Sequence, residues 1–193
     1  MQTLSAAVTS FYYAPGSPKS SYIAQAVTTT LSPGSEWTFY NPYRVYDSYN
    51  AIGFNMRGPQ YSGQWWDIQL WAPKNGLLEV GIYTATRFPF QDQENTMGFD
   101  WSGCGRGCNM SLSYVNILEV EYVNGLITKF AVDFVQAEEV GNRALIDFNN
   151  DRWAQGSFRY DSEIPINTAP IPEPSMFALI GLSLGFVTLR RRK

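Results

Sequence analysis

The sequence contains no histidine, and this absence excludes several kinds of enzyme site. Ser-His-Asp and Cys-His catalysis need an imidazole that exchanges a proton near neutral pH, and many zinc and haem sites use imidazole as a ligand. Carboxylates remain as acids and bases, but only 16% of the residues are charged. We therefore expect a non-enzymatic protein without a cofactor.

Cations are also few outside the last four residues. Of the 14 Lys and Arg residues, four stand at 190–193, and of the 17 Asp and Glu residues, one is Glu173. Residues 1–170 therefore carry ten cations and sixteen anions, a net charge of about −6, which argues against nucleic acid or anionic lipid as a partner. The aromatic content of 16% is typical of a packed domain.

No segment before residue 171 has a helical period of three turns. Short apolar and β-branched runs alternate instead with Gly-, Pro- and Asn-containing turns, which predicts a β domain. The expected strands cover 8–13, 22–30, 37–40, 51–56, 65–72, 77–83, 112–122, 126–135, 145–148 and 157–160, with a long polar loop over 88–109. This spacing predicts an antiparallel sandwich or jelly roll in residues 1–162.

Two of the expected strands have strong local signals. In residues 65–71, Trp66, Ile68 and Leu70 alternate with more polar positions, which predicts one buried face. Asn124-Gly125 separates two long apolar runs, and this dipeptide supplies the positive φ angles of a type I′ hairpin turn.

The C-terminal segment has three parts in order. A Pro-rich linker, residues 163–174, ends in Pro172-Glu173-Pro174, and a short apolar run with a basic end fills residues 175–193. The uncharged stretch 176–189 would span about 21 Å as a helix, less than a hydrocarbon core of about 30 Å. It predicts a short membrane helix whose basic end stays in the cytoplasm. The helix positions are Met176, Leu179, Leu182, Phe186 and Leu189, and the basic stop is Arg190, Arg191, Arg192 and Lys193.

These three parts resemble the PEP-CTERM sorting signal of exported proteins in Gram-negative bacteria that make extracellular polysaccharide. The resemblance implies recognition by an exosortase, a membrane-embedded cysteine protease or transpeptidase, with cleavage near the Pro-Glu-Pro motif. It also implies anchoring in the inner membrane before processing and a final location at the cell surface or in the extracellular matrix. Extracellular polysaccharide is then the expected partner. A permanent tail anchor is the alternative.

The N-terminal residues do not have the pattern of a secretory signal peptide. Residues 1–8 contain no basic region and no apolar core. Because an exported protein needs an entry signal, we expect the true start of the protein to lie upstream of Met1.

The middle of the chain also has a familiar pattern. Residues 78–91 and Gly105-Arg106-Gly107-Cys108-Asn109 resemble a small secreted bacterial β domain without an established activity. This resemblance implies the same fold class and the same compartment.

Four groups of side chains are candidates for chemistry. Cys104 and Cys108 are predicted to close a small disulfide ring, since the glycines between them permit a tight reversal. Aromatic residues usually pack in the core, and the alternative for these adjacent aromatics and amides is a platform for sugar rings. A weak calcium-loop pattern and a set of strand carboxylates predict, as alternatives, a calcium-stabilised adhesion module and a glycan-acting hydrolase. The sugar candidates are Tyr61, Trp65 and Trp71, the calcium candidates are Asp147, Asn149 and Asp151, and the hydrolase candidates are Glu119, Glu121 and Asp133.

Overall fold

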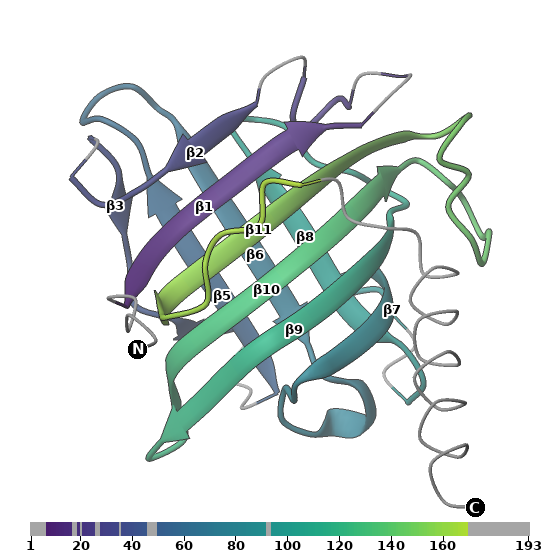
Figure 1. Ribbon diagram of the computed structural model, residues 1–193. Coiled ribbons are helices and arrows are strands. Elements are labelled where there is room, and N and C mark those ends of the chain that lie inside the picture. Colours follow the sequence, from purple (N-terminus) through teal and green to yellow (C-terminus); the bar gives the residue numbers. More distant parts are fainter. Residues whose placement is uncertain are drawn as a thin grey trace, which may run out of the picture.

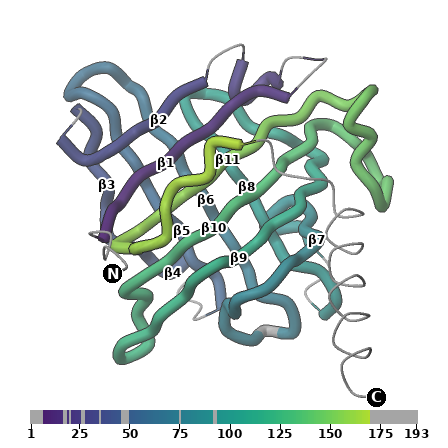
Figure 2. Tube along the Cα trace, viewed as in Figure 1, coloured from purple at the N-terminus to yellow at the C-terminus, as the bar shows by residue number. Residues whose placement is uncertain are grey.

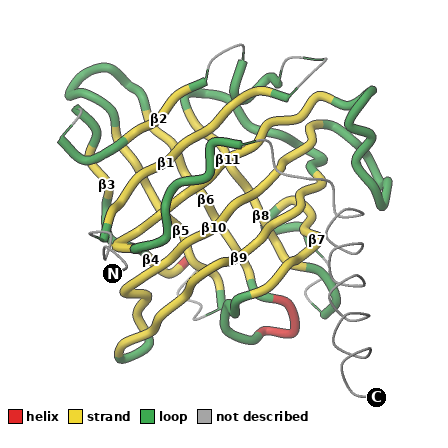
Figure 3. The backbone as a smooth tube through the Cα atoms, viewed as in Figure 1, coloured by secondary structure: helices red, strands yellow, loops and turns green. Residues whose placement is uncertain are grey.

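The computed structural model describes residues 7–16, 19, 21–25, 28–34, 36–45, 50–91 and 94–169. These residues form an all-β domain, which confirms the predicted class. A 3₁₀ turn, η2 (Pro73–Asn75), connects two of the strands (Figure 3). The strands are β1 (Val8–Pro15), β2 (Thr29–Leu31), β3 (Thr38–Phe39), β4 (Tyr43–Arg44), β5 (Ala51–Arg57), β6 (Trp65–Trp71), β7 (Gly81–Arg87), β8 (Met97–Gly103), β9 (Leu112–Val123), β10 (Leu126–Glu138) and β11 (Arg152–Ser162).

All the strands belong to one eleven-stranded sheet, in place of the two separate sheets of a sandwich. The order along the sheet is β2-β1-β11-β10-β9-β7-β8-β6-β5-β3, and β4 also pairs with β5. Strand β7 joins the two halves, because it pairs with β9 antiparallel on one side and with β8 parallel on the other. The sheet therefore curls, so that β1, β11, β10 and β9 lie across β8, β6 and β5 (Figures 1 and 2).

The hydrophobic core lies between the two halves of the curled sheet. Aromatic rings from opposite halves meet there: Phe54 of β5 is 4.8 Å from Phe130 of β10, between ring centroids, and Phe99 of β8 is 4.8 Å from Phe134 of β10. Trp101 of β8 is fully buried beside Phe134. Offset and edge contacts at these distances are favourable for aromatic pairs. Many of the aromatic residues in the sequence therefore pack in the core.

The two strong strand signals are confirmed. In β6, Trp66, Ile68 and Leu70 are buried and the residues between them are half-buried. The hairpin from β9 to β10 turns at Asn124 and Gly125, whose φ angles are 53° and 75°. Both angles are positive, as a type I′ turn requires.

The expected strand over 22–30 is wrong in its first half, where the chain makes a turn. The carboxylate of Glu138 holds this turn, since it accepts hydrogen bonds from the Ser21 hydroxyl and from the amides of Tyr22 (2.7 Å) and Ile23 (3.1 Å). The apolar residues of this segment predicted a strand, but in the turn Ile23 and Ala24 pack in the core.

The long loop expected over 88–109 contains β8. Met97, Phe99 and Trp101 are buried on one face of this strand, and the glycines and polar residues between them led to the loop prediction. Gly98 leaves room for the end of the Gln91 side chain, because a Cβ there would lie 2.6 Å from Gln91 Cδ. Large apolar residues do alternate at Met97, Phe99 and Trp101, but the glycines beside them are typical of a loop.

Residues 163–169, hereafter the strap, begin with a bend after the end of β11 and run back over that strand (Figure 1). The guanidinium of Arg159 donates to the carbonyl oxygens of Ile164 and Pro165. The first seven residues of the predicted linker therefore contact the folded sheet.

The predicted sorting motif, membrane helix and basic stop lie outside the described residues. Among the residues that are described, no helix is long and apolar enough to cross a membrane.

Candidate functional site

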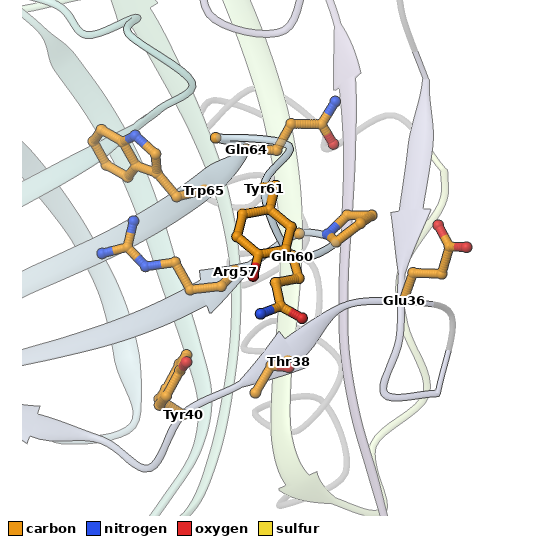
Figure 4. Close-up of a pocket in the computed structure, with 11 residues that line it drawn as sticks. Glu36, Thr38, Tyr40, Arg57, Gln60, Tyr61, Gln64 and Trp65 are labelled. Atoms are coloured by element: carbon orange, nitrogen blue, oxygen red, sulfur yellow. The ribbon is translucent and has the colours of Figure 1, made fainter.

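A cleft of about 550 Å³ opens beside the connection from β5 to β6. Side chains from β3, from the end of β5 and from the start of β6 surround it (Figure 4). Its lining combines three aromatic side chains with amides and one charge of each sign. The lining residues are Glu36, Thr38, Tyr40, Arg57, Gly58, Pro59, Gln60, Tyr61, Gly63, Gln64 and Trp65.

The turn over residues 58–64 presents Tyr61 to solvent. The Gly58 amide donates to the Gln64 carbonyl (2.9 Å), and the Ser62 amide donates to the Pro59 carbonyl (2.9 Å), so the turn is internally bonded. Tyr61 is 95% exposed and has a φ of 69°. A positive φ is unfavourable for a bulky residue, so the turn holds Tyr61 in a backbone conformation that such residues rarely adopt.

Trp65 lines the cleft from the start of β6, and its side chain and main chain both have partners. The Arg57 guanidinium lies 5.6 Å from the Trp65 ring centroid, in a cation–π contact across the β5–β6 pair. The Trp65 carbonyl accepts the Cys104 amide at 2.9 Å. The sequence placed Tyr61 and Trp65 together, whereas Tyr40 and Arg57 reach the cleft through strand pairing, which no local pattern reveals.

Trp71 does not join the cleft. It ends β6, about 20 Å along the strand from Trp65, and its ring packs 5.4 Å from that of Phe88. Val45 and Ala51 also belong to this small hydrophobic cluster, which is separate from the main core. The three predicted sugar candidates therefore divide into a pair at one end of β6 and a packed tryptophan at the other.

A polar network lies on the same face of β6, between the two tryptophans. The Tyr43 hydroxyl is 2.9 and 3.0 Å from the two carboxylate oxygens of Asp67, and Gln69 Nε2 donates to that hydroxyl at 3.1 Å. Burial raises the pKa of Tyr43 to about 12 and also raises the pKa of Asp67. The network ties β4 to β6 and supports the strand that carries Trp65.

The three hydrolase candidates have other partners, and none of them lines the cleft. Asp133 is buried and accepts from Arg159, from Ser157 (2.7 Å) and from Asn167 (3.2 Å). Glu119 accepts from the Ser162 hydroxyl, and Glu121 lies 3.9 Å from Lys129 Nζ. Each of the three carboxylates therefore has a hydrogen-bond or ion-pair partner within the fold.

The calcium candidates form a turn stabilised by its own hydrogen bonds. Asp147 Oδ1 accepts the amides of Asn149 (3.0 Å) and Asn150 (3.2 Å), and Asp147 Oδ2 accepts from the Asn150 side chain. The bond from the Asn150 side chain is the largest of the effects that lower the pKa of Asp147. Asp151 pairs with Arg143. Within the described ranges, no group of three or more metal-ligating side chains is present.

The predicted disulfide between Cys104 and Cys108 is not formed, since both are free thiols. Cys104 lies in a tight turn closed by the pairing of Gly103 with Arg106, and its thiol donates to the Trp65 carbonyl at 3.3 Å. Cys108 is buried, and its sulfur accepts the Glu139 amide at 3.2 Å. The two thiols are thus directed to separate partners.

Comparison with known proteins gave one match. Residues 170–193 match the family model of the PEP-CTERM protein-sorting motif. No curated protein matched the chain, and no solved structure matched its fold.

Proposed function

Because the chain carries a PEP-CTERM protein-sorting motif, we propose that it is a non-enzymatic protein of the cell surface or extracellular matrix that associates with extracellular polysaccharide. The motif implies export and processing of a membrane-anchored precursor by an exosortase. In this proposal residues 176–189 anchor the precursor in the inner membrane, with Arg190–Lys193 on the cytoplasmic side.

The cleft supports the polysaccharide part of the proposal. A sugar ring has an apolar C–H face that packs on an aromatic ring and hydroxyls that bond to amides, and the cleft offers both kinds of surface. Tyr61 is the single observation that carries this part, because its ring is almost fully exposed at a cleft that Trp65 also lines. Gln60 and Gln64 flank it with amide groups (Figure 4).

The sorting part is tested by mass spectrometry of the protein isolated from the source cells. We expect the mature C-terminus near Glu173, with residues 176–193 removed. A mature protein that keeps its Arg-rich end would overturn exosortase processing and leave a tail anchor.

The binding part is tested by co-sedimentation with the extracellular polysaccharide purified from the same cells. Tyr61→Ala and Trp65→Ala should each weaken binding at least about tenfold, because a truncated aromatic anchor loses most of its contact area. Tyr22→Ala is the matched control, since Tyr22 is also an exposed tyrosine (53%) but lies away from the cleft. Equal binding by Tyr61→Ala and Tyr22→Ala would refute the cleft as the site.

The same polysaccharide distinguishes binding from hydrolysis. We expect the protein to release no reducing ends from it. Release that is abolished by Glu119→Gln or Asp133→Asn would contradict the non-enzymatic proposal and favour the hydrolase.

A further inference from the structure

The strap is attached to the sheet along its whole described length. In its first half, Arg159 Nε lies 3.1 Å from the Ile164 carbonyl oxygen, and Arg159 Nη2 lies 2.9 Å from that of Pro165. Arg159 itself is 1% exposed and also bonds to Asp133 and to the Val132 carbonyl. The side chain that holds the strap is therefore fixed within the sheet.

In its second half, the strap is held by side chains of β1, β10 and β11. The Asn167 amide donates to Ser157 Oγ (2.9 Å), and Asn167 Nδ2 donates to Asp133 Oδ2 (3.2 Å). Tyr12 donates to the Thr168 carbonyl (3.3 Å), and Gln155 donates to the Ala169 carbonyl (3.2 Å). The bonded segment thus extends to Ala169, directly before the residues that match the sorting motif.

This attachment limits how far the tail can extend from the domain. Glu173 follows Ala169 by four residues, and a fully extended chain of that length spans about 14 Å. Release of the seven strap residues would add about 25 Å. Enzymes that act on peptides commonly bind them as extended strands over several residues, and a bulky domain so near the cleavage point obstructs such binding.

We propose that the strap regulates tail processing: docked on the sheet it holds the Pro-Glu-Pro motif close to the domain and slows cleavage, and when released it makes the motif accessible. This inference rests on the proposed exosortase processing. In that reaction a peptide bond near Glu173 breaks and its acyl group passes to water or to an amine. The strap changes access to the bond and takes no part in the chemistry.

The strap is hydrogen-bonded to side chains outside the hydrophobic core, so changes to these side chains should loosen it without unfolding the core. Tyr12→Phe removes the bond to Thr168, and Asn167→Ala removes the bond to Asp133. Together they should shift the docking equilibrium toward release by about tenfold. Matched control changes are Tyr83→Phe and Asn150→Ala, which remove bonds to the Glu79 carbonyl and to Asp147 away from the strap.

The experiment follows tail removal in full-length protein co-expressed with the exosortase, by pulse–chase gel shift. The Tyr12→Phe/Asn167→Ala variant should be processed several-fold faster than wild type, whereas the Tyr83→Phe/Asn150→Ala control should match wild type. A flexible Gly-Ser insertion of about eight residues after Ala169 adds roughly 16 Å of reach. It should also accelerate processing, although the strap stays docked.

Hydrogen exchange of the purified full-length variants measures the strap directly. The amide of residue 167, which donates to Ser157 Oγ, should be equally protected in wild type and in the insertion variant, and should exchange about tenfold faster in the Tyr12→Phe/Asn167→Ala variant. Equal processing rates in variants whose strap protection differs would overturn the inference while leaving sorting intact. A tail retained by every variant, including wild type, would overturn both the sorting proposal and this inference.

Discussion

Arg159 Nη2 lies 2.9 Å from Asp133 Oδ1, and both side chains are buried between the sheet and the strap. Each partner has additional bonds: Arg159 donates to four main-chain carbonyls, and Asp133 accepts from Ser157 and Asn167. A buried ion pair offsets its desolvation only when its remaining hydrogen-bonding groups are satisfied in this way. The pair therefore joins β10, β11 and the strap into one unit.

Removing one partner of this pair should destabilise the domain strongly. Arg159→Met leaves a buried carboxylate without its cation, and we expect a loss of about 3–5 kcal/mol in the free energy of unfolding. Urea denaturation measures it. Lys129→Met breaks the exposed pair with Glu121 and should cost at most about 1 kcal/mol. Similar losses in the two variants would show that the buried pair has no special role.

A glycine of β11 tests the packing between the strand and the core. A Cβ at Gly156 would lie 2.2 Å from Phe134 Cζ, and Phe134 is fully buried. Gly156→Ala should therefore destabilise the domain by about 1–3 kcal/mol through displacement of the ring. Gly76→Ala is the control, because the nearest atom to its Cβ, the Pro73 carbonyl oxygen, is 3.5 Å away. The melting temperatures of both variants, measured by thermal unfolding, test this prediction. Equal melting temperatures would contradict it.

The parts of the fold that the sequence predicted are those with local signals. Asn124-Gly125 forms the predicted hairpin turn, and β6 buries the face that carries Trp66. The parts it missed depend on contacts between distant segments. Glu138 converts the predicted strand near Tyr22 into a turn, and the parallel pairing of β7 with β8 makes the two halves one sheet.

The candidate site was predictable to the same extent. Tyr61 and Trp65 are near in sequence and meet in the cleft, whereas Tyr40 arrives there through the pairing of β3 with β5. Prolines in residues 163–174 predicted an extended linker, but the attachment of the strap to the sheet depends on Arg159. Nothing local distinguishes an arginine that binds a returning segment from one that faces water.

Asp100 gives a prediction about pH. Burial is the main reason that its pKa is raised, and the nearby Asp67 adds to it. The folded state therefore binds a proton more readily than the unfolded state, so this group's contribution to stability is fully present below the unfolded pKa, about 3.9, and is lost as pH rises through the folded pKa. Asp100→Asn should be more stable than wild type at pH 7, and the difference should disappear as pH falls below about 4. Urea denaturation across pH measures this difference. A stability difference that stays constant with pH would contradict a raised pKa of Asp100.

Cys108 should react very slowly with alkylating reagents in the folded protein. Its side chain is 2% exposed, and burial, followed by the charges of Glu139 and Glu138, raises its pKa to about 12. Only the thiolate reacts, and at pH 8 about one molecule in ten thousand would carry it. In the Cys104→Ser variant, we expect iodoacetamide at pH 8 to label Cys108 at least about a hundredfold more slowly than in urea, as followed by mass spectrometry. Comparable rates in both conditions would show that Cys108 is accessible. A wild-type mass two hydrogens below that of the reduced chain would show that Cys104 and Cys108 form a disulfide.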